Sequence, residues 1–468
     1  MSLPNPIGRQ KEVLYLPAQG HCVVLGTAGS GKTTMAILRA AYLSKLAPTQ
    51  KVMLVTFNKT LVTYLESLGE VELANVDIRT YHHFARGYLK ARGRMRDGAI
   101  LDVDPRLILV NTALSEVRQS QTPISILGRP PEAFAEEIQW ISRSGISLED
   151  EYVSAERVGR EDSRIMRKDR PAVWKVYQRY IDLRRLAGYD FDWDDIAKSA
   201  CEEFESDSSP RMYNHIVVDE GQDFSPIMLR SLTLAIPTDG SLTFFGDMAQ
   251  QIYGSRVSWR SAGLKPPKVW LFKENYRNTK QIAQLGLAIS KMPFFRGVAD
   301  LVEPSSPKAD GPLPTVVRCK DKDEEMEFVV KNALIMGRTQ CVAILNRNRE
   351  KDGTYIVRIT SHGPSVSVSR LHRDMNTWRS DPGVYVGTYH SAKSLEFDAV
   401  LLPYCSEDVL PDSSRIAALG SEDEAKSEEA RLLYVAVTRA KVRLIITYSG
   451  NVTELLPKES ALYQEVEP

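Results

Sequence analysis

A glycine-rich loop limits the folds open to this chain more than any other feature. Residues 26–33 read Gly-Thr-Ala-Gly-Ser-Gly-Lys-Thr and match the pattern GxxxxGK followed by Ser or Thr. The apolar run His21–Gly26 leads into this loop, and the helical pattern Thr33–Lys45 follows it. A loop of this kind between a strand and a helix indicates a parallel sheet covered by helices.

The chemistry of the loop points to a nucleoside triphosphate. Glycines let backbone N–H groups converge on phosphate oxygens, and the dipole of the following helix adds positive potential. We expect Lys32 to reach the β- and γ-phosphates and the Thr33 hydroxyl to bind Mg²⁺. The alternative, a chance glycine-rich turn, is disfavoured by the complete motif in its expected setting. The predicted ATP-binding loop comprises Gly26, Thr27, Ala28, Gly29, Ser30, Gly31, Lys32, Thr33 and Thr34.

Two further apolar runs end in polar residues. The run from His215 ends in Asp219 and Glu220, and the run from Ser241 leads towards Gln250. In a parallel sheet such strand ends lie beside the phosphate loop. We therefore expect Asp219 to hold Mg²⁺ and Glu220 to activate the attacking water as a general base. Gln250 would sense the γ-phosphate. Without the phosphate loop upstream, the alternatives would be preferred: the two acids would mark the surface end of a strand, and Gln250 would be an ordinary polar loop residue.

Two arginines much later in the chain have distinctive surroundings. Arg277 follows Glu-Asn-Tyr, and Arg439 ends an apolar stretch that begins at Leu433. Phosphoryl transfer gains from arginines that neutralise charge in the transition state. With 60 basic residues in the chain, neither arginine stands out alone, and only the order of the surrounding segments selects them.

Taken together and in order, these segments resemble the motifs of the UvrD/Rep/PcrA-like superfamily 1 DNA helicases. The resemblance runs over nearly the whole chain. The matching segments are Gln10 (Q motif), Val55–Lys59 (Ia), Arg79–Phe84 (Ib), Tyr189–Asp192, Val218–Asp223 (II), Gly246–Tyr253 (III), Asn275–Arg277 (IV), Gly387–Asp398 (V) and Glu428–Ala440 (VI). So many matches in one order make coincidence negligible.

The resemblance implies roles around the nucleotide. Gln10 would read the adenine edge, Tyr276 would stack on the adenine, and Glu396 would lie near the ribose. Arg277 and Arg439 would contact the γ-phosphate from the second domain. The expected catalytic set is Lys32, Glu220, Gln250, Arg277 and Arg439.

The resemblance also implies a groove for single-stranded DNA. Stacking of bases on aromatic side chains tolerates any sequence and contributes ~1–3 kcal/mol per base. The expected strand-contacting residues are Phe57, Asn58, Thr80, His82, Trp259 and His390. For Phe57 and Trp259 the alternative is packing in the core, and for the two histidines it is a structural role.

Departures from the family pattern also carry information. Many relatives have an arginine in place of Thr34, where it packs on the second face of the adenine. Motif V usually has a glycine where Ser394 stands, and if that glycine uses a positive φ, Ser394 carries a backbone cost. A mobile accessory domain called 2B is inserted before motif V in full-length relatives. Here only about forty residues separate Cys341–Arg347 from that motif, too few for a domain.

The order of predicted elements indicates an α/β fold, with two RecA-like P-loop domains built on parallel sheets and a helical insertion subdomain in the first. Residues 1–90 and 172–285 would form the first domain, residues 91–171 the helical insertion, and residues 286–468 the second domain. Further strands are expected at Val52–Thr56, Thr315–Arg318, Gln340–Leu345, Gly383–Gly387, Ala399–Leu402 and Val442–Thr447. The acidic run Ser421–Glu429 is expected to be a solvated helix start.

Composition adds only weak constraints. Lysine plus arginine equals aspartate plus glutamate at 60 each, so binding of nucleic acid would have to use a local groove. No run approaches about 18 apolar residues, and the N-terminus has no apolar signal core, so neither a membrane span nor secretion is expected. The five cysteines are scattered, which disfavours a zinc site and is typical of a reduced cytoplasmic protein.

The sequence therefore predicts an ATP hydrolase. The resemblance implies a DNA helicase or translocase that acts on single-stranded or 3′-tailed duplex DNA, moves 3′ to 5′, and uses ATP and Mg²⁺. The alternative is an ATP-switched subunit that clamps DNA or a protein partner, for example a nuclease, without processive unwinding. The zero net charge and the missing accessory domain favour this alternative modestly. An RNA-directed enzyme fits less well, because the motifs resemble the DNA branch, whose members serve DNA repair, recombination and phage defence.

Overall fold

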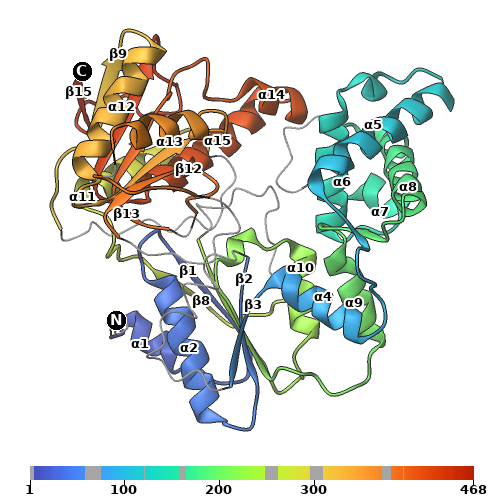
Figure 1. The fold of residues 1–468 in the computed structure, drawn as a ribbon. Coiled ribbons are helices and arrows are strands. Elements are labelled where there is room, and N and C mark those ends of the chain that lie inside the picture. The colour runs from blue at the N-terminus through green and yellow to red at the C-terminus, as the bar shows by residue number, and fades with distance from the viewer. Residues whose placement is uncertain are drawn as a thin grey trace.

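The computed structural model describes residues 5–57, 75–120, 122–157, 165–247, 262–295, 309–363, 365–371, 381–393 and 395–468. Figure 1 shows two lobes built on sheets and a third lobe made of helices. The first lobe is built on the six-stranded sheet, the second lobe on the seven-stranded sheet, and the helical lobe on helices α5 to α8. The predicted α/β class, with two RecA-like parallel-sheet domains and a helical insertion, is confirmed.

The first lobe contains a six-stranded sheet in the order β3-β2-β6-β7-β1-β8, in which all neighbours are parallel. Its strands are β1 (Gly20–Gly26), β2 (Val52–Thr56), β3 (Val76–Thr80), β6 (His215–Val218), β7 (Ser241–Gly246) and β8 (Val269–Phe272). The strands expected from the apolar runs are all present. The two edge strands, β3 and β8, were not predicted, because each is only partly buried.

Helices cover both faces of this sheet. One face packs on α1 (Arg9–Leu14) and α2 (Lys32–Leu46). The other packs on α4 (Tyr81–Ala91), α9 (Ile196–Ser206) and α10 (Pro226–Leu234). Figure 1 shows these two groups on opposite sides of the strands. The short 3-10 turn η3 (Gly221–Asp223) follows β6.

The helical lobe has its own aromatic core. It contains α5 (Val103–Ser120), α6 (Pro131–Ser144), α7 (Glu149–Ser154) and α8 (Arg170–Leu186), with the 3-10 turns η1 (Ser125–Gly128) and η2 (Arg167–Asp169). The two-residue strands β4 (Ile100–Leu101) and β5 (Phe191–Asp192) pair at its base. Helix α8 packs here through Trp174, Tyr177 and Tyr180, although the predicted insertion 91–171 ends where α8 begins.

The second lobe contains a seven-stranded parallel sheet in the order β11-β12-β10-β13-β14-β9-β15. Its strands are β9 (Thr315–Cys319), β10 (Cys341–Asn346), β11 (Val368–Arg370), β12 (Gly383–Thr388), β13 (Phe397–Leu402), β14 (Ala440–Ser449) and β15 (Gln464–Val466). Its helices are α11 (Lys280–Ser290), α12 (Lys322–Met336), α13 (Asp352–Ser361), α14 (Ser413–Leu419) and α15 (Glu422–Val437). The predicted domain boundary at residue 285 falls inside α11, whose apolar side chains are buried in the second lobe.

Two expectations concern the second lobe, namely that the segment before motif V is too short for an inserted domain and that the acidic run is a solvated helix start. Between β10 and β12 the described residues contain only α13 and β11. As expected, a helix starts in the acidic run: α15 has Ser421 as its N-cap. Glu429, at the end of the run, was expected to be solvated but is fully buried. Within the described part of the chain, no helix is both long and apolar enough to cross a membrane.

Candidate active site

The phosphate loop leaves β1 at Gly26 and enters α2 at Lys32. Gly29 has a φ of 73°, in the left-handed region that favours glycine. A Cβ on Gly29 would also lie 2.4 Å from Asn275 Oδ1, so no side chain fits there. The buried hydroxyls of Thr27 and Ser30 have no hydrogen-bond partner among the described residues. The loop is therefore lined by polar groups that phosphate oxygens could engage.

Lys32 folds its ammonium group back onto its own loop. Nζ donates to the carbonyl oxygens of Gly26 at 2.9 Å and Thr27 at 2.6 Å, and lies 3.6 Å from Asp247 Oδ2. Burial lowers the pKa of Lys32, while Asp247 and Glu220 act in the opposite direction. Because a phosphate oxygen carries a full negative charge and a carbonyl oxygen only a partial one, a phosphate would be a better partner for this ammonium than two carbonyls.

Strand β6 delivers Asp219 to the same place. Asp219 is buried, and neither carboxylate oxygen makes a well-formed hydrogen bond among the described residues. Burial raises the pKa of Asp219 and the charge of Glu220 raises it further, whereas the nearby Thr33 hydroxyl favours the charged form. Buried carboxylate oxygens beside a hydroxyl fit a hard cation such as Mg²⁺, which binds oxygen ligands.

Glu220 is held in an uncommon backbone conformation, with a φ of 52°. Gln222 links this residue to β7: its Nε2 donates to Glu220 Oε2 at 2.5 Å, and its Oε1 accepts from the Asp247 N–H at 2.8 Å. Burial opposes the charge on Glu220, but Lys32 and Lys393 outweigh burial and keep its pKa below the usual range. Glu220 therefore remains a carboxylate, as a general base requires.

A turn around Arg277 connects the phosphate loop to the second lobe. On one side, the Tyr276 N–H donates to Gly29 O at 2.9 Å. On the other side, Asn278 Nδ2 donates to Thr438 O at 3.1 Å. Asn278 was not singled out from the sequence, because only the fold brings it to the end of α15. The turn therefore fixes Arg277 relative to both halves of the site.

Arg277 and Arg439 approach the site from its second side. Arg277 Nη2 lies 2.6 Å from Glu396 Oε1, so the residue expected near the ribose pairs with an arginine here. Arg439 is buried, and its Nε donates to Val435 O at 3.0 Å. Burial lowers the pKa of Arg439 to about 10 and the charge of Arg277 adds to this, while Glu220 opposes it. The two cations are thus close enough to influence each other and the carboxylate across the interface.

The residues expected around the base lie at the rim of the loop. Gln10 Nε2 donates to Ser30 O at 3.1 Å, and its Oε1 accepts from the Ile7 N–H at 3.1 Å. The Tyr276 side chain is 53% exposed and offers a face for stacking. Thr34 is half-buried in the first turn of α2, where a threonine provides no flat surface for the opposite face of a base.

Comparison with known protein families identifies the family of this chain. The family described as "UvrD/REP helicase N-terminal domain" matches residues 8–266, and "UvrD-like helicase C-terminal domain" matches residues 366–451. This chain belongs to the UvrD/REP helicase family. The predicted membership of the UvrD/Rep/PcrA-like group is confirmed. The prediction of an ATP-hydrolysing helicase is confirmed with it.

Individual relatives of this helicase span most of its length. It is 25% identical to the ATP-dependent DNA helicase UvrD2 of Mycobacterium tuberculosis, across 94% of this chain and 78% of that protein. A probable DNA helicase of Mycoplasma pneumoniae is 23% identical, across 91% of this chain and 80% of its own. DNA helicase II of Haemophilus influenzae is 27% identical, across 58% and 38%.

The residues expected to contact a DNA strand fall into separate groups. Phe57 and His82 lie together, with ring centroids 5.6 Å apart. Thr80 acts as the N-cap of α4, its Oγ1 accepting from the His83 N–H at 3.3 Å. This structural role was not predicted, and it leaves strand contact by Thr80 untested. Four residues singled out from the sequence lie outside the described residues, namely Asn58, Gln250, Trp259 and Ser394.

His390 lies half-buried in the second lobe. Burial, followed by the charges of Arg347 and Lys393, lowers the pKa of His390 to about 3. Its imidazole is therefore neutral near pH 7. A neutral ring can stack on a base or accept a hydrogen bond, but it cannot neutralise a phosphate.

Two buried ion pairs in this helicase were not predicted. Lys393 Nζ contacts the Asp223 carboxylate, which links motif V to motif II across the interface of the sheet lobes. Arg347 Nε lies 2.8 and 2.6 Å from the two carboxylate oxygens of Glu429. No local pattern in a sequence reveals pairs so far apart along the chain, although the motifs mark three of these four residues.

Another contact joins the second lobe to the helical lobe. Arg415 of α14 reaches Glu136 of α6, with Nη2 donating to Oε2 at 3.2 Å. Arg415 Nε also donates to Glu428 Oε2 at 2.9 Å. Figure 1 shows α14 extending from the second lobe towards α6. All three lobes are therefore in contact with one another.

Proposed function

We propose that this helicase moves along single-stranded DNA from 3′ to 5′ and hydrolyses ATP between the first and second lobes. The observation that carries this proposal is the packing of the Arg277 turn against Gly29 of the phosphate loop, together with the mutual influence of Arg439 and Glu220 on each other's pKa. One lobe supplies the loop and the carboxylates, and the other supplies Arg439. Such an arrangement couples hydrolysis to the relative position of the lobes.

Nucleotide binding would use groups that already point at the loop. The β- and γ-phosphates would draw Lys32 away from the carbonyls of Gly26 and Thr27. Thr33 and Asp219 would hold Mg²⁺, which when bound neutralises charge on the phosphates. Tyr276 would stack on the adenine while the Gln10 amide reads its edge.

In the hydrolytic step, Glu220 would accept a proton from the attacking water. Arg277 would leave Glu396 and, with Arg439, stabilise the charge on the transferred phosphoryl group. Loss of that group would remove the shared partner of the two arginines. The lobes could then separate, and alternating grip on a strand would convert this motion into steps.

We place the strand on the surface marked by Phe57, His82 and His390. Aromatic rings accept bases of any sequence, which suits a motor. We further propose that the protein works in the cytoplasm and without a 2B accessory domain. A helicase without this domain would depend on the DNA substrate or on a protein partner to separate duplexes efficiently.

A second candidate is an ATP-switched clamp, acting alone or with a partner such as a nuclease. The contact between Arg415 and Glu136 favours it, because this contact joins the second lobe to the helical lobe and could be remade in each nucleotide state. A clamp would bind DNA according to nucleotide state without travelling along it.

Strand displacement separates these functions. Duplexes with a 3′ tail, a 5′ tail or blunt ends would be incubated with the protein, ATP and Mg²⁺. We expect displacement from the 3′-tailed duplex alone. DNA-stimulated hydrolysis without displacement would indicate a translocase that needs help to unwind. Displacement from the 5′ tail would contradict the direction, and hydrolysis indifferent to DNA would favour the clamp.

A further inference from the structure

Arg39 is a cation buried in the first lobe. It lies on α2, about two helical turns beyond Lys32 of the phosphate loop, and is 1% exposed. The guanidinium donates from Nη1 to the carbonyl oxygens of Leu14 and Leu16 at 2.8 and 2.7 Å, and from Nη2 to that of Pro17 at 2.8 Å. Burying a charge costs free energy unless its partners replace the lost water. Here these partners all belong to the segment that ends α1.

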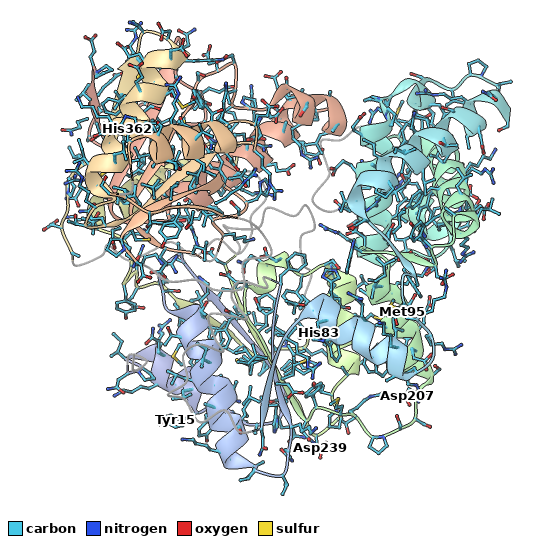
Figure 2. All side chains as sticks on the ribbon, in the orientation of Figure 1. Tyr15, His83, Met95, Asp207, Asp239 and His362 are labelled. Carbon is cyan, nitrogen blue, oxygen red and sulfur yellow. The ribbon has the colours of Figure 1, made fainter. Side chains whose placement is uncertain are left out.

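The segment that Arg39 holds is too short to be stable by itself. Helix α1 has only six residues, and a helix of fewer than about 12 residues is marginal in water. The last carbonyl groups of a helix have no partner within it and carry partial negative charge. Arg39 supplies both the hydrogen bonds and the positive charge that this end of α1 needs. In Figure 2 the labelled Tyr15, which directly follows α1, lies beside the helices of the first lobe, and its ring centroid is 5.2 Å from that of Tyr42 on α2.

The other end of α1 carries Gln10. Its Nε2 donates to Ser30 O in the phosphate loop and its Oε1 accepts from the Ile7 N–H, each at 3.1 Å. These two bonds fix the orientation of the amide and leave it one N–H and one oxygen lone pair for a ligand. Adenine offers a donor at N6 beside an acceptor at N7, whereas guanine offers acceptors at both places. Because Thr34 gives no flat surface to the base, the choice between the two bases would fall largely on this amide.

We propose that Arg39 is a positioning residue for base selection: it holds the carbonyl end of α1, and the short helix transmits that hold to the Gln10 amide. The inference deepens the proposed function and rests on it, because Gln10 must read the adenine. Arg39 itself is buried and lies about 10 Å along α2 from Lys32, so it acts through α1 and not by touching the nucleotide. An arginine with a purely structural role would affect stability and leave the preference for ATP over GTP unchanged.

The helical lobe contains a matched control for this arginine. Arg170 is 6% exposed, and its Nη1 donates to the carbonyl oxygens of Tyr152, Val153 and Ala155 at 2.9, 2.7 and 2.8 Å. These carbonyls lie at the end of α7, which like α1 has six residues. In both arginines Nε is buried and has no hydrogen-bond partner among the described residues. The same arrangement therefore occurs beside the phosphate loop and in a lobe that provides none of the predicted nucleotide contacts.

Hydrolysis of ATP and of GTP would be measured at saturating oligothymidylate for the wild type, Arg39→Met, Arg39→Lys, Arg170→Met and Gln10→Ala. We expect Arg39→Met to lower the ratio of kcat/KM for ATP to that for GTP by about 3- to 10-fold, as for the loss of one hydrogen bond, through a higher KM for ATP and with kcat nearly unchanged. Arg39→Lys should lie between the wild type and Arg39→Met, because an ammonium lacks the planar fork that reaches three carbonyls. Arg170→Met should lower the thermal unfolding temperature and keep the ratio. In the Gln10→Ala background, Arg39→Met should leave the ratio as it is.

The outcomes separate this inference from the proposed function. A wild type with equal kcat/KM for the two nucleotides, or an unchanged ratio in Gln10→Ala, would overturn the reading of adenine by Gln10 and the inference with it. A loss in Gln10→Ala with an unchanged ratio in Arg39→Met, or an equal loss in Arg39→Met and Arg170→Met, would overturn the inference alone. A further loss when Arg39→Met is added to Gln10→Ala would also overturn it. Should Arg39→Met not fold, Arg39→Lys decides: a ratio between those of the wild type and Gln10→Ala supports the inference, and the wild-type ratio contradicts it.

Discussion

The two sheet lobes share a layered architecture but differ in the chemistry they bring to their interface. In the first lobe, β1 leads into a phosphate loop, and β6 and β7 end beside Asp219 and Asp247. In the second lobe, the equivalent region contains Arg347 and Lys393 after strand ends and Arg439 at the end of α15. One lobe gathers acids around a single buried lysine, and the other gathers cations.

This difference shows that a repeated fold need not give a repeated site. A parallel sheet positions loops at its edge, but the residues in those loops decide what binds. Among the described residues the two edges are complementary: one offers the phosphate cradle, and the other offers the cations that would stabilise the reaction in the proposed function. If either lobe supported hydrolysis without the other, the two edges would not depend on each other.

Removing the cation of the second lobe should have the largest effect. We expect Arg439→Ala to lower kcat for ATP hydrolysis by about 10³- to 10⁵-fold, as for other arginine fingers. Steady-state hydrolysis and nucleotide binding would be measured together. Arg443→Ala, an exposed position on β14, is the matched control. An unchanged kcat in Arg439→Ala would show that the first lobe acts alone.

Removing the proposed general base of the first lobe should have the next largest effect. Glu220→Gln keeps the size of the side chain and its contact with Gln222 but removes the proton acceptor. We expect kcat to fall by about 10²- to 10⁴-fold while ATP still binds. Single-turnover hydrolysis measures this directly, with the exposed Glu202→Gln as control. Near-normal hydrolysis in Glu220→Gln would exclude this carboxylate as the base.

The buried pair between the lobes should make a smaller, structural contribution. Asp223→Asn leaves Lys393 buried without its carboxylate, which costs about 3–5 kcal/mol in comparable cases. We expect a lower thermal unfolding temperature and partial recovery in the double variant Asp223→Asn, Lys393→Met. Differential scanning calorimetry would measure both. If the double variant were no more stable than the single one, the contact would not be an isolated pair.

The second lobe should also respond to acid through His390. Its folded pKa of about 3 lies below the ordinary value of 6.5, so between these values the unfolded chain binds the proton more readily. Stability is therefore lost as the pH falls below 6.5, by at most about 1.4 kcal/mol per pH unit. Comparing the wild type with His390→Gln at a series of pH values isolates this contribution. Parallel stability curves would mean that His390 titrates normally.

The partly exposed ion pair between the second lobe and the helical lobe should matter least. Arg415 and Glu136 are both partly exposed, and pairs of this kind contribute about 0–1 kcal/mol. A double-mutant cycle with Arg415→Ala and Glu136→Ala would give the coupling free energy. A coupling as large as that of Asp223 with Lys393 would mean that the helical lobe is held as firmly as the two sheets are held together.

Much of this organisation could be predicted from the sequence, for physical reasons. The strands β1, β2, β6 and β7 are continuous apolar runs because both their faces are covered. The edge strand β3 escaped prediction because Asp77 and Arg79 interrupt its apolar character. Helix α8 was assigned to the wrong side of a proposed boundary, since its packing partners lie in α5 and α6.

The residues of the candidate site also fall into those that local sequence predicts and those that it does not. Lys32, Asp219 and Glu220 follow from local motifs, since a loop and a strand end place them. Arg277 and Arg439 were assigned to the site only through the resemblance to a family, because no local sequence pattern shows that their side chains face the phosphate loop. Asn278 and the contact of Asp223 with Lys393 depend on how separate elements meet, and only a structure shows that.

We infer that ATP turnover occurs at the interface of the lobes and responds to a DNA strand. Steady-state hydrolysis would be measured for the wild type and for Lys32→Ala, each with and without oligothymidylate. We predict a wild-type rate that rises about tenfold or more with the strand, and a Lys32→Ala rate reduced by at least about 100-fold in both conditions. A wild-type rate that does not change with the strand, or a Lys32→Ala rate equal to that of the wild type, would show that this loop is not the site of DNA-coupled turnover.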